Sequence, residues 1–385
     1  MKKRRIVIAS ILKPVDDTRM FEKMGVTLSD SGKYEIFIVG HPSRNVPAYA
    51  NIHFLPLKPF PRLSVARLLA PLKIFRILYQ VSPQILIVNT HELLIVAILN
   101  RIFFGAKIVY DIRENYYRNL LYAESFPILL RPLLAGWVRL KEKVASPLFH
   151  HFFLAEKGYQ KEMNFFGNQA TLIENKAIVP RGLSRIKEPG KVRLLFSGTL
   201  AESTGVFQAI HLARKLHDLN NAIQLTLIGY CAKSEALKRL LDEIEGFPFI
   251  QLHGGNRLVP HPEVIQAIYH SDFGVVCYPP SRHTENTIPT KLYEYLACGL
   301  PILLQHHRPW VELASRYHAC VAIDIPNANP HTLLEQMQGS FYPSASAFSR
   351  PGRDTADGPA QIASIQEGVT WESEAEKFLA ALDKI

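Results

Sequence analysis

The feature that most constrains the fold is an alternation of strand and helix patterns that runs through the chain twice. In the first half, short runs of Val, Ile and Leu predict strands at 5–10, 35–40, 85–89 and 107–111. Such continuous apolar runs are typical of parallel strands that helices cover on both faces. The pattern restarts after residue 191, with strands predicted at 192–196, 224–229, 250–253 and 274–277. The sequence therefore predicts an α/β protein with two Rossmann-like, doubly wound parallel sheets.

The boundary between these two domains falls in a polar linker, VPRGLSRIKEPGK (179–191), which is rich in Pro, Gly and Arg. We expect one domain over residues 1–178 and a second over residues 192–368. Residues 340–361 are rich in Ser, Ala, Pro and Gly, which predicts a mobile loop. An amphipathic helix over 369–385 closes the chain.

The segment ENTIPTKLYEYLACGLPILL (285–304) predicts a loop, a short helix and a buried strand. Pro289 suits the first turn of a helix, because its missing N–H would have had no partner there. Gly299 suits a left-handed helix end, and Pro301 prevents the helix from continuing. Such a helix begins at the carboxyl edge of a parallel sheet, where its free N–H groups favour a phosphate.

Two charged residues of this helix, Lys291 and Glu294, are three positions apart and therefore share a face. A cation one turn into the helix would lie near the bound anion, and a carboxylate beside it could hold a diol. The alternative is an exposed Lys–Glu pair of little consequence, which is common at this spacing.

The order of residues in this segment resembles the nucleotide-sugar helix of glycosyltransferase family 4, whose members are retaining enzymes of the GT-B fold. Their pattern has two carboxylates eight positions apart, an aromatic residue after the second, and a Gly-x-Pro strand start. Glu294 matches the second carboxylate, which in the family holds the nucleotide ribose. Asn286 stands in the place of the first, next to Glu285, so the hydrogen-bonding role is kept without its charge.

The resemblance implies two domains that face across a cleft, with the last helix packed back on the N-terminal domain. It also implies a nucleotide-diphosphate sugar as the donor and transfer with retention of configuration. Enzymes of this fold stabilise the leaving diphosphate with cations and helix dipoles. We therefore expect neither a metal ion nor a cofactor.

On the donor side, Gly198 ends a strand where the backbone could approach a diphosphate closely. Relatives carry basic residues at the positions of Thr199 and Thr204, and hydroxyl groups cannot neutralise a phosphate. We expect Lys291, Arg282 and the helix N-terminus to supply the missing charge.

Further donor-side candidates follow from the resemblance, although each also has an ordinary structural explanation. They are the strand-end residues Gly229, Tyr230 and His253, and Thr287 and Ile288, which lead into the helix. The candidates for catalysis itself are His91, Asn286 and Lys291.

In the first domain, Asp17 and Arg19 match an Asp-x-Arg motif that shapes the acceptor side in a subgroup of the family. The alternative is a helix-capping aspartate with a salt-bridged arginine. Asp111 and Glu114 match an Asp-x-His-Glu motif, but Arg113 replaces its histidine. Because an arginine stays protonated at neutral pH, residue 113 cannot be a general base.

The positive charge of the chain is concentrated in its first part. Residues 1–170 carry 24 basic and 12 acidic side chains, whereas the remaining residues carry 20 and 22. No nucleic-acid-binding motif accompanies this charge. Residues 61–81 and 126–144 mix basic and large apolar residues, which favours helices, interrupted at Pro71 and Pro132, that lie on an anionic membrane. Alternatively, these are core helices with solvated basic faces.

The sequence thus predicts a glycosyltransferase that acts on a lipid-linked or surface-polysaccharide acceptor at the inner face of the cell membrane. No stretch is long and apolar enough to span the bilayer, and the four cysteines lack metal-ligand spacing, as in reduced cytoplasmic proteins. Two alternatives remain. The first is a catalytically silent relative that binds a glycan or serves in assembly, which the four departures from the motifs favour. The second is a sugar-nucleotide epimerase.

Overall fold

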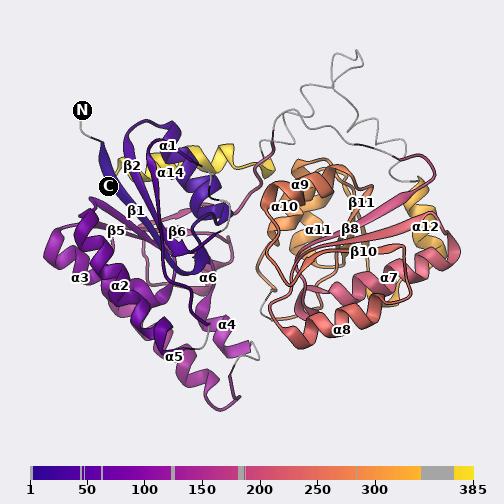
Figure 1. Cartoon of the computed structure of the whole chain (residues 1–385), viewed down its shortest axis with the longest axis horizontal. Helices are drawn as coiled ribbons and strands as arrows, with labels where there is room; N and C mark the ends of the chain where they lie inside the picture. Colours follow the sequence, from indigo (N-terminus) through magenta and orange to yellow (C-terminus); the bar gives the residue numbers. More distant parts are fainter. Residues whose placement is uncertain are drawn as a thin grey trace. The chain divides into compact units, whose positions relative to one another are not determined.

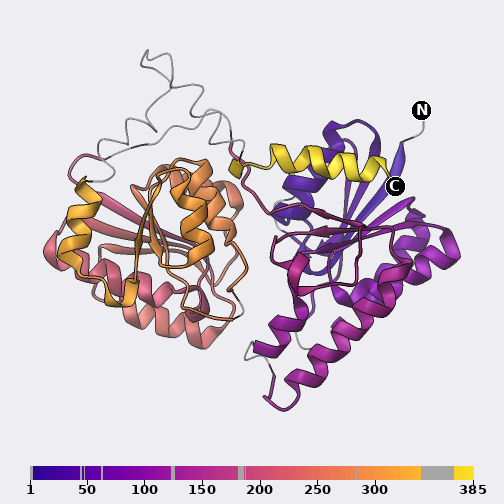
Figure 2. The same cartoon turned by 180° about the vertical axis from the view of Figure 1, so that it is seen from behind.

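The computed structural model describes residues 3–43, 46, 48–61, 64–122, 126–180, 186, 188–282, 284–339 and 368–385. The chain forms two compact units (Figures 1 and 2). Unit 1 consists of Met1–Asn175, Arg282–Thr287 and Trp371–Ile385, and unit 2 consists of Lys176–Ser281 and Ile288–Thr370. The loop predicted at 340–361 lies outside the described residues.

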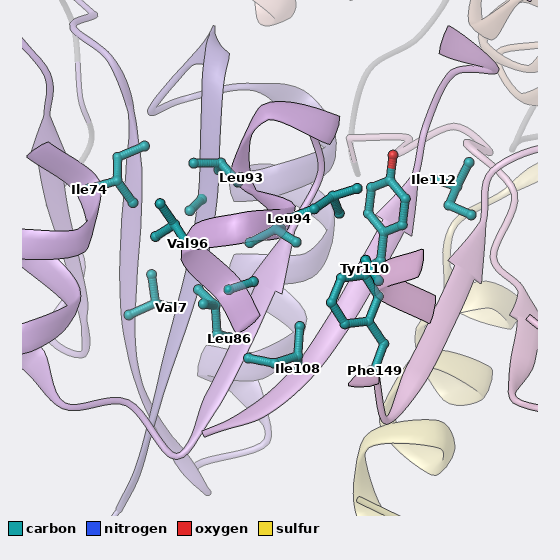
Figure 3. Packing of buried hydrophobic residues seen from close by; sticks show 14 of the residues in the cluster. Val7, Ile74, Leu86, Leu93, Leu94, Val96, Ile108, Tyr110, Ile112 and Phe149 are labelled. Atoms are coloured by element: carbon teal, nitrogen blue, oxygen red, sulfur yellow. The ribbon is translucent and has the colours of Figure 1, made fainter. Parts of the chain in front are cut away.

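Unit 1 is built on a parallel seven-stranded sheet with the order β3-β2-β1-β4-β5-β6-β7. Its strands are β1 (Arg4–Pro14), β2 (Tyr34–His41), β3 (Ile52–Pro56), β4 (Ile85–Val88), β5 (Lys107–Ile112), β6 (His151–Leu154) and β7 (Ala170–Leu172). One face is covered by α2 (Val65–Val81), α3 (Leu94–Phe104) and α5 (Arg131–Ala145). Their inner side chains, including Ile74 and Leu94, pack on Val7, Leu86 and Ile108 of the strands (Figure 3).

The opposite face of this sheet carries η1 (Thr18–Gly25), α1 (Val26–Asp30) and the C-terminal helix α14 (Glu372–Asp383). The Phe153 ring lies 5.3 Å from that of Phe378, and the Trp371 indole donates a hydrogen bond to Thr27. The last helix therefore packs in unit 1, as the resemblance implied. Three short helical segments, η2 (His91–Leu93), α4 (Tyr116–Tyr122) and α6 (Tyr159–Glu162), follow β4, β5 and β6 at the carboxyl edge, and η3 (Ser146–Leu148) precedes β6.

Unit 2 has a parallel six-stranded sheet with the order β10-β9-β8-β11-β12-β13. Its strands are β8 (Val192–Thr199), β9 (Ile223–Tyr230), β10 (Ile250–Gly255), β11 (Phe273–Val276), β12 (Ile302–Gln305) and β13 (Cys320–Ile323). Its helical segments are η4 (Glu202–Thr204), α7 (Val206–Leu219), α8 (Ser234–Ile244), α9 (His261–Tyr269), α10 (Thr290–Ala297), α11 (Arg308–Ser315), η5 (Ile325–Asn327) and α12 (Pro330–Gly339). Two apolar clusters fill its two faces. The prediction of two Rossmann-like parallel sheets is confirmed.

The two prolines that we expected to interrupt helices do not do so. Pro71 lies inside the continuous helix α2. Pro132 lies in the first turn of α5, where a missing N–H breaks no hydrogen bond. Within the described residues, no helix combines the length and the hydropathy needed to cross a membrane.

Candidate active site

Helix α10 has the ends that its sequence predicts. Pro289 is the residue before its first turn, and Gly299 adopts a positive φ of 66° just beyond its last turn. The Tyr295 hydroxyl bonds to the backbone N–H of Ser197 at 3.1 Å and to its side chain at 2.9 Å. A Cβ on Gly274 would lie 2.4 Å from the Tyr295 ring, so the small residue at 274 makes room for it. These contacts fix α10 against β8 and β11.

Lys291 is a buried cation at the start of this helix. Its side chain is 5% exposed, and its ammonium lies 3.7 Å from the centroid of the Phe196 ring. The described part of the chain offers this ammonium no hydrogen-bond partner. Burial lowers the pKa of Lys291 to about 8, since an ammonium loses its hydration in an apolar setting. The alternative of an exposed Lys–Glu pair is therefore wrong.

The backbone beside Lys291 is open because two glycines stand at the ends of β8 and β9. Gly198 adopts a φ of +99°, and a Cβ at this position would lie 3.7 Å from Cε of Lys291. Gly229 pairs with Gly198 in register, and a Cβ on Gly229 would lie 1.7 Å from the Gly198 carbonyl oxygen. Only glycine fits at 229, so the two strand ends can lie close together. The arrangement leaves Gly198 and Lys291 on one small surface suited to an anion.

The two threonines that replace basic residues of the family have different surroundings. Thr199 is an exposed residue at the end of β8. The Thr204 hydroxyl donates to the carbonyl oxygens of Thr199 at 2.7 Å and of Ala201 at 2.8 Å. Thr204 thus closes the turn before α7.

Glu294 is also buried, at 7% exposure, and lies 3.3 Å from Nε2 of His261 at the start of α9. The sequence did not point to His261, because it is 33 positions away and nothing in its surroundings marks it as a partner. The histidine therefore lies within ion-pair distance of a carboxylate on the same helix that carries Lys291.

The remaining donor-side candidates of unit 2 lie on the neighbouring strands. Tyr230 is the last residue of β9, and Ile288 is half-buried just before α10. His253 is exposed on β10, where it lines a pocket with Gln251 and Glu263 that does not include Lys291.

The other loop candidates belong to unit 1. The Asn286 amide donates to Glu162 at 2.8 Å. Arg118 donates to the carbonyl of Arg282 and lies 3.4 Å from Glu285.

In the same loop, Thr287 bonds back to Thr284 through its backbone N–H and its hydroxyl. A Cβ on Gly158 would lie 2.7 Å from Asn286, so the contact at that position is close. A glutamate at 286, as in the family, would bring a second carboxylate beside Glu162. The neutral amide avoids this repulsion.

The acceptor-side candidates form two ion pairs at the carboxyl edge of the first sheet. Arg19 and Asp111 are fully buried and joined by bonds of 2.7 and 2.9 Å. Asp17 accepts the backbone N–H groups of residues 19 and 20, and it also pairs with Arg113 at 2.7 Å. Burial raises the pKa of Asp17, but the charge and hydrogen bonds of Arg113 outweigh it and bring the pKa to about 2. Asp17 therefore caps the N-terminus of η1, which was the alternative to an acceptor-side role in the sequence analysis.

Two further candidates flank these pairs. Glu114 lies 3.5 Å from Lys13 and accepts a hydrogen bond from Asn119. His91 begins η2, with its Nδ1 3.2 Å from the ammonium of Lys141. Burial lowers the pKa of His91 to about 4, so the imidazole is neutral at pH 7 and can accept a hydrogen bond.

We also searched the described residues for clusters of side chains that could bind a metal ion. Across the described ranges, no three His, Cys, Asp or Glu side chains are grouped so that they could hold an ion. All four cysteines lie in the described residues and none forms a disulfide, and Cys231, Cys277 and Cys298 are buried.

The fold is that of known glycosyltransferases. A sucrose-phosphate synthase from Thermosynechococcus elongatus superposes with a TM-score of 0.73 at 12% identity, over 99% of each chain. HepE from Anabaena, solved with UDP and glucose, gives 0.62 at 12% identity, over 99% of each chain. A trehalose 6-phosphate synthase from Burkholderia multivorans gives 0.59 at 11% identity, over 100% of this chain and 99% of the other. The GT-B fold class predicted from the sequence is thereby confirmed.

A similarity to a sequence family is found in the second half of the chain. Residues 184–338 match the family model described as glycosyl transferases group 1, a range that begins before β8 and ends in the last turn of α12. This range of the chain is therefore similar to that family. No curated protein matches the sequence.

Proposed function

We propose that the protein is a retaining glycosyltransferase of family 4 that takes its sugar from a nucleotide-diphosphate donor. The observation that carries the proposal is the Lys291 ammonium, which is buried beside Gly198 without a hydrogen-bond partner in the described residues. An unpaired buried cation is costly to the fold, so its presence calls for an anionic ligand. A diphosphate supplies that anion.

Each part of the donor then has a partner in unit 2. The N–H groups of the first turn of α10 and the Lys291 ammonium hold the diphosphate. Glu294, which lies beside His261, accepts hydrogen bonds from the ribose hydroxyls. The HepE structure contains UDP and glucose. UDP-sugars are therefore the first donors to test.

In the reaction, the bond between the sugar's anomeric carbon and the diphosphate oxygen breaks, and a bond to an acceptor hydroxyl forms on the same face. The proton of that hydroxyl passes to the leaving phosphate oxygen, so no protein base is required. Lys291 and the helix N-terminus stabilise the negative charge that develops on the leaving group. This arrangement needs neither a metal ion nor a cofactor.

The acceptor is a lipid-linked sugar or a surface polysaccharide, and the enzyme works at the inner face of the cell membrane. The excess of basic side chains in residues 1–170 supports an anionic surface as a partner. His91 and the Asp17–Arg113 pair are the acceptor-side residues of this proposal.

A second candidate function is a silent relative that binds a glycan. The turn at Thr204 favours this candidate. The Thr204 hydroxyl already bonds to two backbone carbonyls, and the side chain has no charge with which to bind a diphosphate. The two candidates differ in donor binding.

The test is calorimetric titration of the full chain with UDP, GDP and their sugars. We expect Lys291→Met to weaken donor binding by about 10- to 100-fold, the range for a hydrogen bond to a charged group. Lys238→Met, which changes an exposed lysine of α8, is the matched control and should bind like the parent. Failure of the parent to bind any nucleotide at millimolar concentration would overturn the proposal in favour of the silent relative.

A further inference from the structure

Helix α2 is apolar on two opposite sides. Ala70 and Ile74 are buried against the sheet. Val65, Leu68 and Leu72 recur at helical spacing on the other side and are exposed, Leu68 at 77%. A helix that only covers a sheet needs one apolar stripe, so the second stripe is unexplained by packing within unit 1.

The neighbouring helices continue this outward stripe. Ile95 and Ile102 of α3 are exposed and two turns apart. On α5, Leu133 and Trp137 are exposed, and Leu129 in the turn before the helix is 85% exposed. Helix α3 packs against both α2 and α5 in unit 1 (Figures 1 and 2). The exposed apolar side chains of these three helices are therefore neighbours, and we call this surface the three-helix face.

The charges around the three-helix face have one sign. Helices α2, α3 and α5 together carry eight basic side chains and one acidic side chain, and the acidic one, Glu142, is buried. Lys73, Arg76 and Lys143 are exposed, and the described residues provide none of them with an ion-pair partner. An exposed apolar surface with a basic border matches the interfacial region of an anionic bilayer.

We propose that the three-helix face lies flat on an anionic lipid bilayer, with its apolar side chains inserted among the headgroups. This inference deepens the proposed function, because it names the surface that brings the enzyme to a lipid-linked acceptor. That part of the inference rests on the proposed function. A second copy of the chain is a poor occupant, because a symmetric contact would bring the same basic residues together. The helices have 17, 11 and 15 residues and lie across the sheet, so they rest on the bilayer without entering its core.

The direction of the helices connects this face to the acceptor side of unit 1. A helix that follows a parallel strand begins near the carboxyl edge of the sheet. The first turns of α2 and α3 therefore lie at the edge that carries His91 and Arg113. A bilayer against the three-helix face would present lipid headgroups next to these residues, as a lipid-linked acceptor requires.

The experiment uses the full chain with vesicles of phosphatidylcholine, alone or mixed with phosphatidylglycerol. Trp137 is 58% exposed, whereas Trp310 and Trp371 are buried, so the fluorescence of Trp137 should respond to insertion. We expect co-sedimentation and a blue shift with the anionic vesicles, both weakened by salt. The shift should be absent in Trp137→Phe, although this variant should still co-sediment.

Two variants separate the apolar and the basic contributions. Leu129→Ser with Leu133→Ser should reduce the vesicle partition coefficient at least 10-fold, because both side chains are exposed and their loss leaves the fold intact. Lys73→Gln with Arg76→Gln should reduce partitioning into anionic vesicles by roughly 5-fold per residue. The matched control is Leu258→Ser, an exposed leucine of unit 2, which should change nothing.

The inference is overturned if the parent does not bind anionic vesicles at low salt, or if the double leucine variant binds as well as the parent. It is also overturned if light scattering shows a dimer that Leu129→Ser with Leu133→Ser dissociates, since a second copy then covers the face. Titration of the same protein with UDP-sugars distinguishes the two proposals. Donor binding without vesicle binding removes only this inference, and the reverse result removes the proposed function.

Discussion

Helices α2 and α7 each cover one face of a parallel sheet, α2 in unit 1 and α7 in unit 2, yet their outer faces differ. Both bury an apolar stripe against a parallel sheet, represented by Ile74 in α2 and Ile210 in α7. The outer face of α7 carries polar and charged residues such as Lys215 and Asp218, whereas that of α2 carries leucines. Covering a sheet therefore does not require the outer stripe, and the apolar surface of unit 1 serves another purpose.

The buried charges show a second contrast. Unit 1 pairs Arg19 with Asp111 and Asp17 with Arg113. Unit 2 leaves the Lys291 ammonium on an aromatic ring without a hydrogen bond in its described part. The buried charges of unit 1 are neutralised within the protein. The ammonium of Lys291 would instead gain its hydrogen-bond acceptor from a bound anion.

The largest expected effect breaks a pair in unit 1. Asp111→Ala leaves the Arg19 guanidinium buried and uncompensated, which should lower the free energy of unfolding by about 3–5 kcal/mol. Guanidinium unfolding of parent and variant measures the loss. Asp218→Ala, at an exposed position of α7, is the control and should stay within about 0.5 kcal/mol. A loss below about 1 kcal/mol would show that the pair is not buried.

The next comparison separates the two faces of α2. Ile74→Ala should cost about 2–5 kcal/mol, as should Ile210→Ala in α7, because each leaves a cavity against a sheet. Leu72→Ala should change the free energy of unfolding by no more than about 0.5 kcal/mol. These values again come from denaturant unfolding. If Leu72→Ala were as costly as Ile74→Ala, the outer stripe would be part of the core.

A smaller effect concerns pH and Lys291. The pKa of Lys291 is about 8 in the folded chain and the ordinary lysine pKa is 10.5, so above pH 8 the unfolded chain binds a proton that the folded chain does not. Stability should therefore rise with pH above 8, by about 2 kcal/mol up to pH 9.5, relative to Lys291→Met. Unfolding of parent and variant across this range, without donor, gives the difference. Parallel pH profiles would contradict it.

The sequence predicted those features that depend on neighbouring residues. The ends of α10 follow from Pro289 and Gly299, and the strands follow from their apolar runs. The short edge strand Ile52–Pro56 was missed, because five residues ending in proline give little periodic pattern. Pro71 was misread as a break, although packing of Ile74 and Leu78 holds α2 continuous around it.

Contacts between distant positions could not be predicted in the same way. Nothing in the sequence connects His261 with Glu294, or Glu162 with Asn286, since each pair is brought together only by the packed sheets. The same holds for the burial of Lys291, which depends on Phe196 from another strand. Local sequence thus identified the helix, while tertiary packing determined the environment of its charges.

Unit 1 is assembled from three separate stretches of the chain, and the last of them is Trp371–Ile385. During synthesis, Phe378 can therefore reach Phe153 only after all of unit 2 has been translated. Unit 2 itself is translated without interruption by a long stretch of unit 1, since only Arg282–Thr287 intervenes. A nonsense mutation just before residue 371 would remove a helix layer from the sheet of unit 1 and leave the sheet of unit 2 covered.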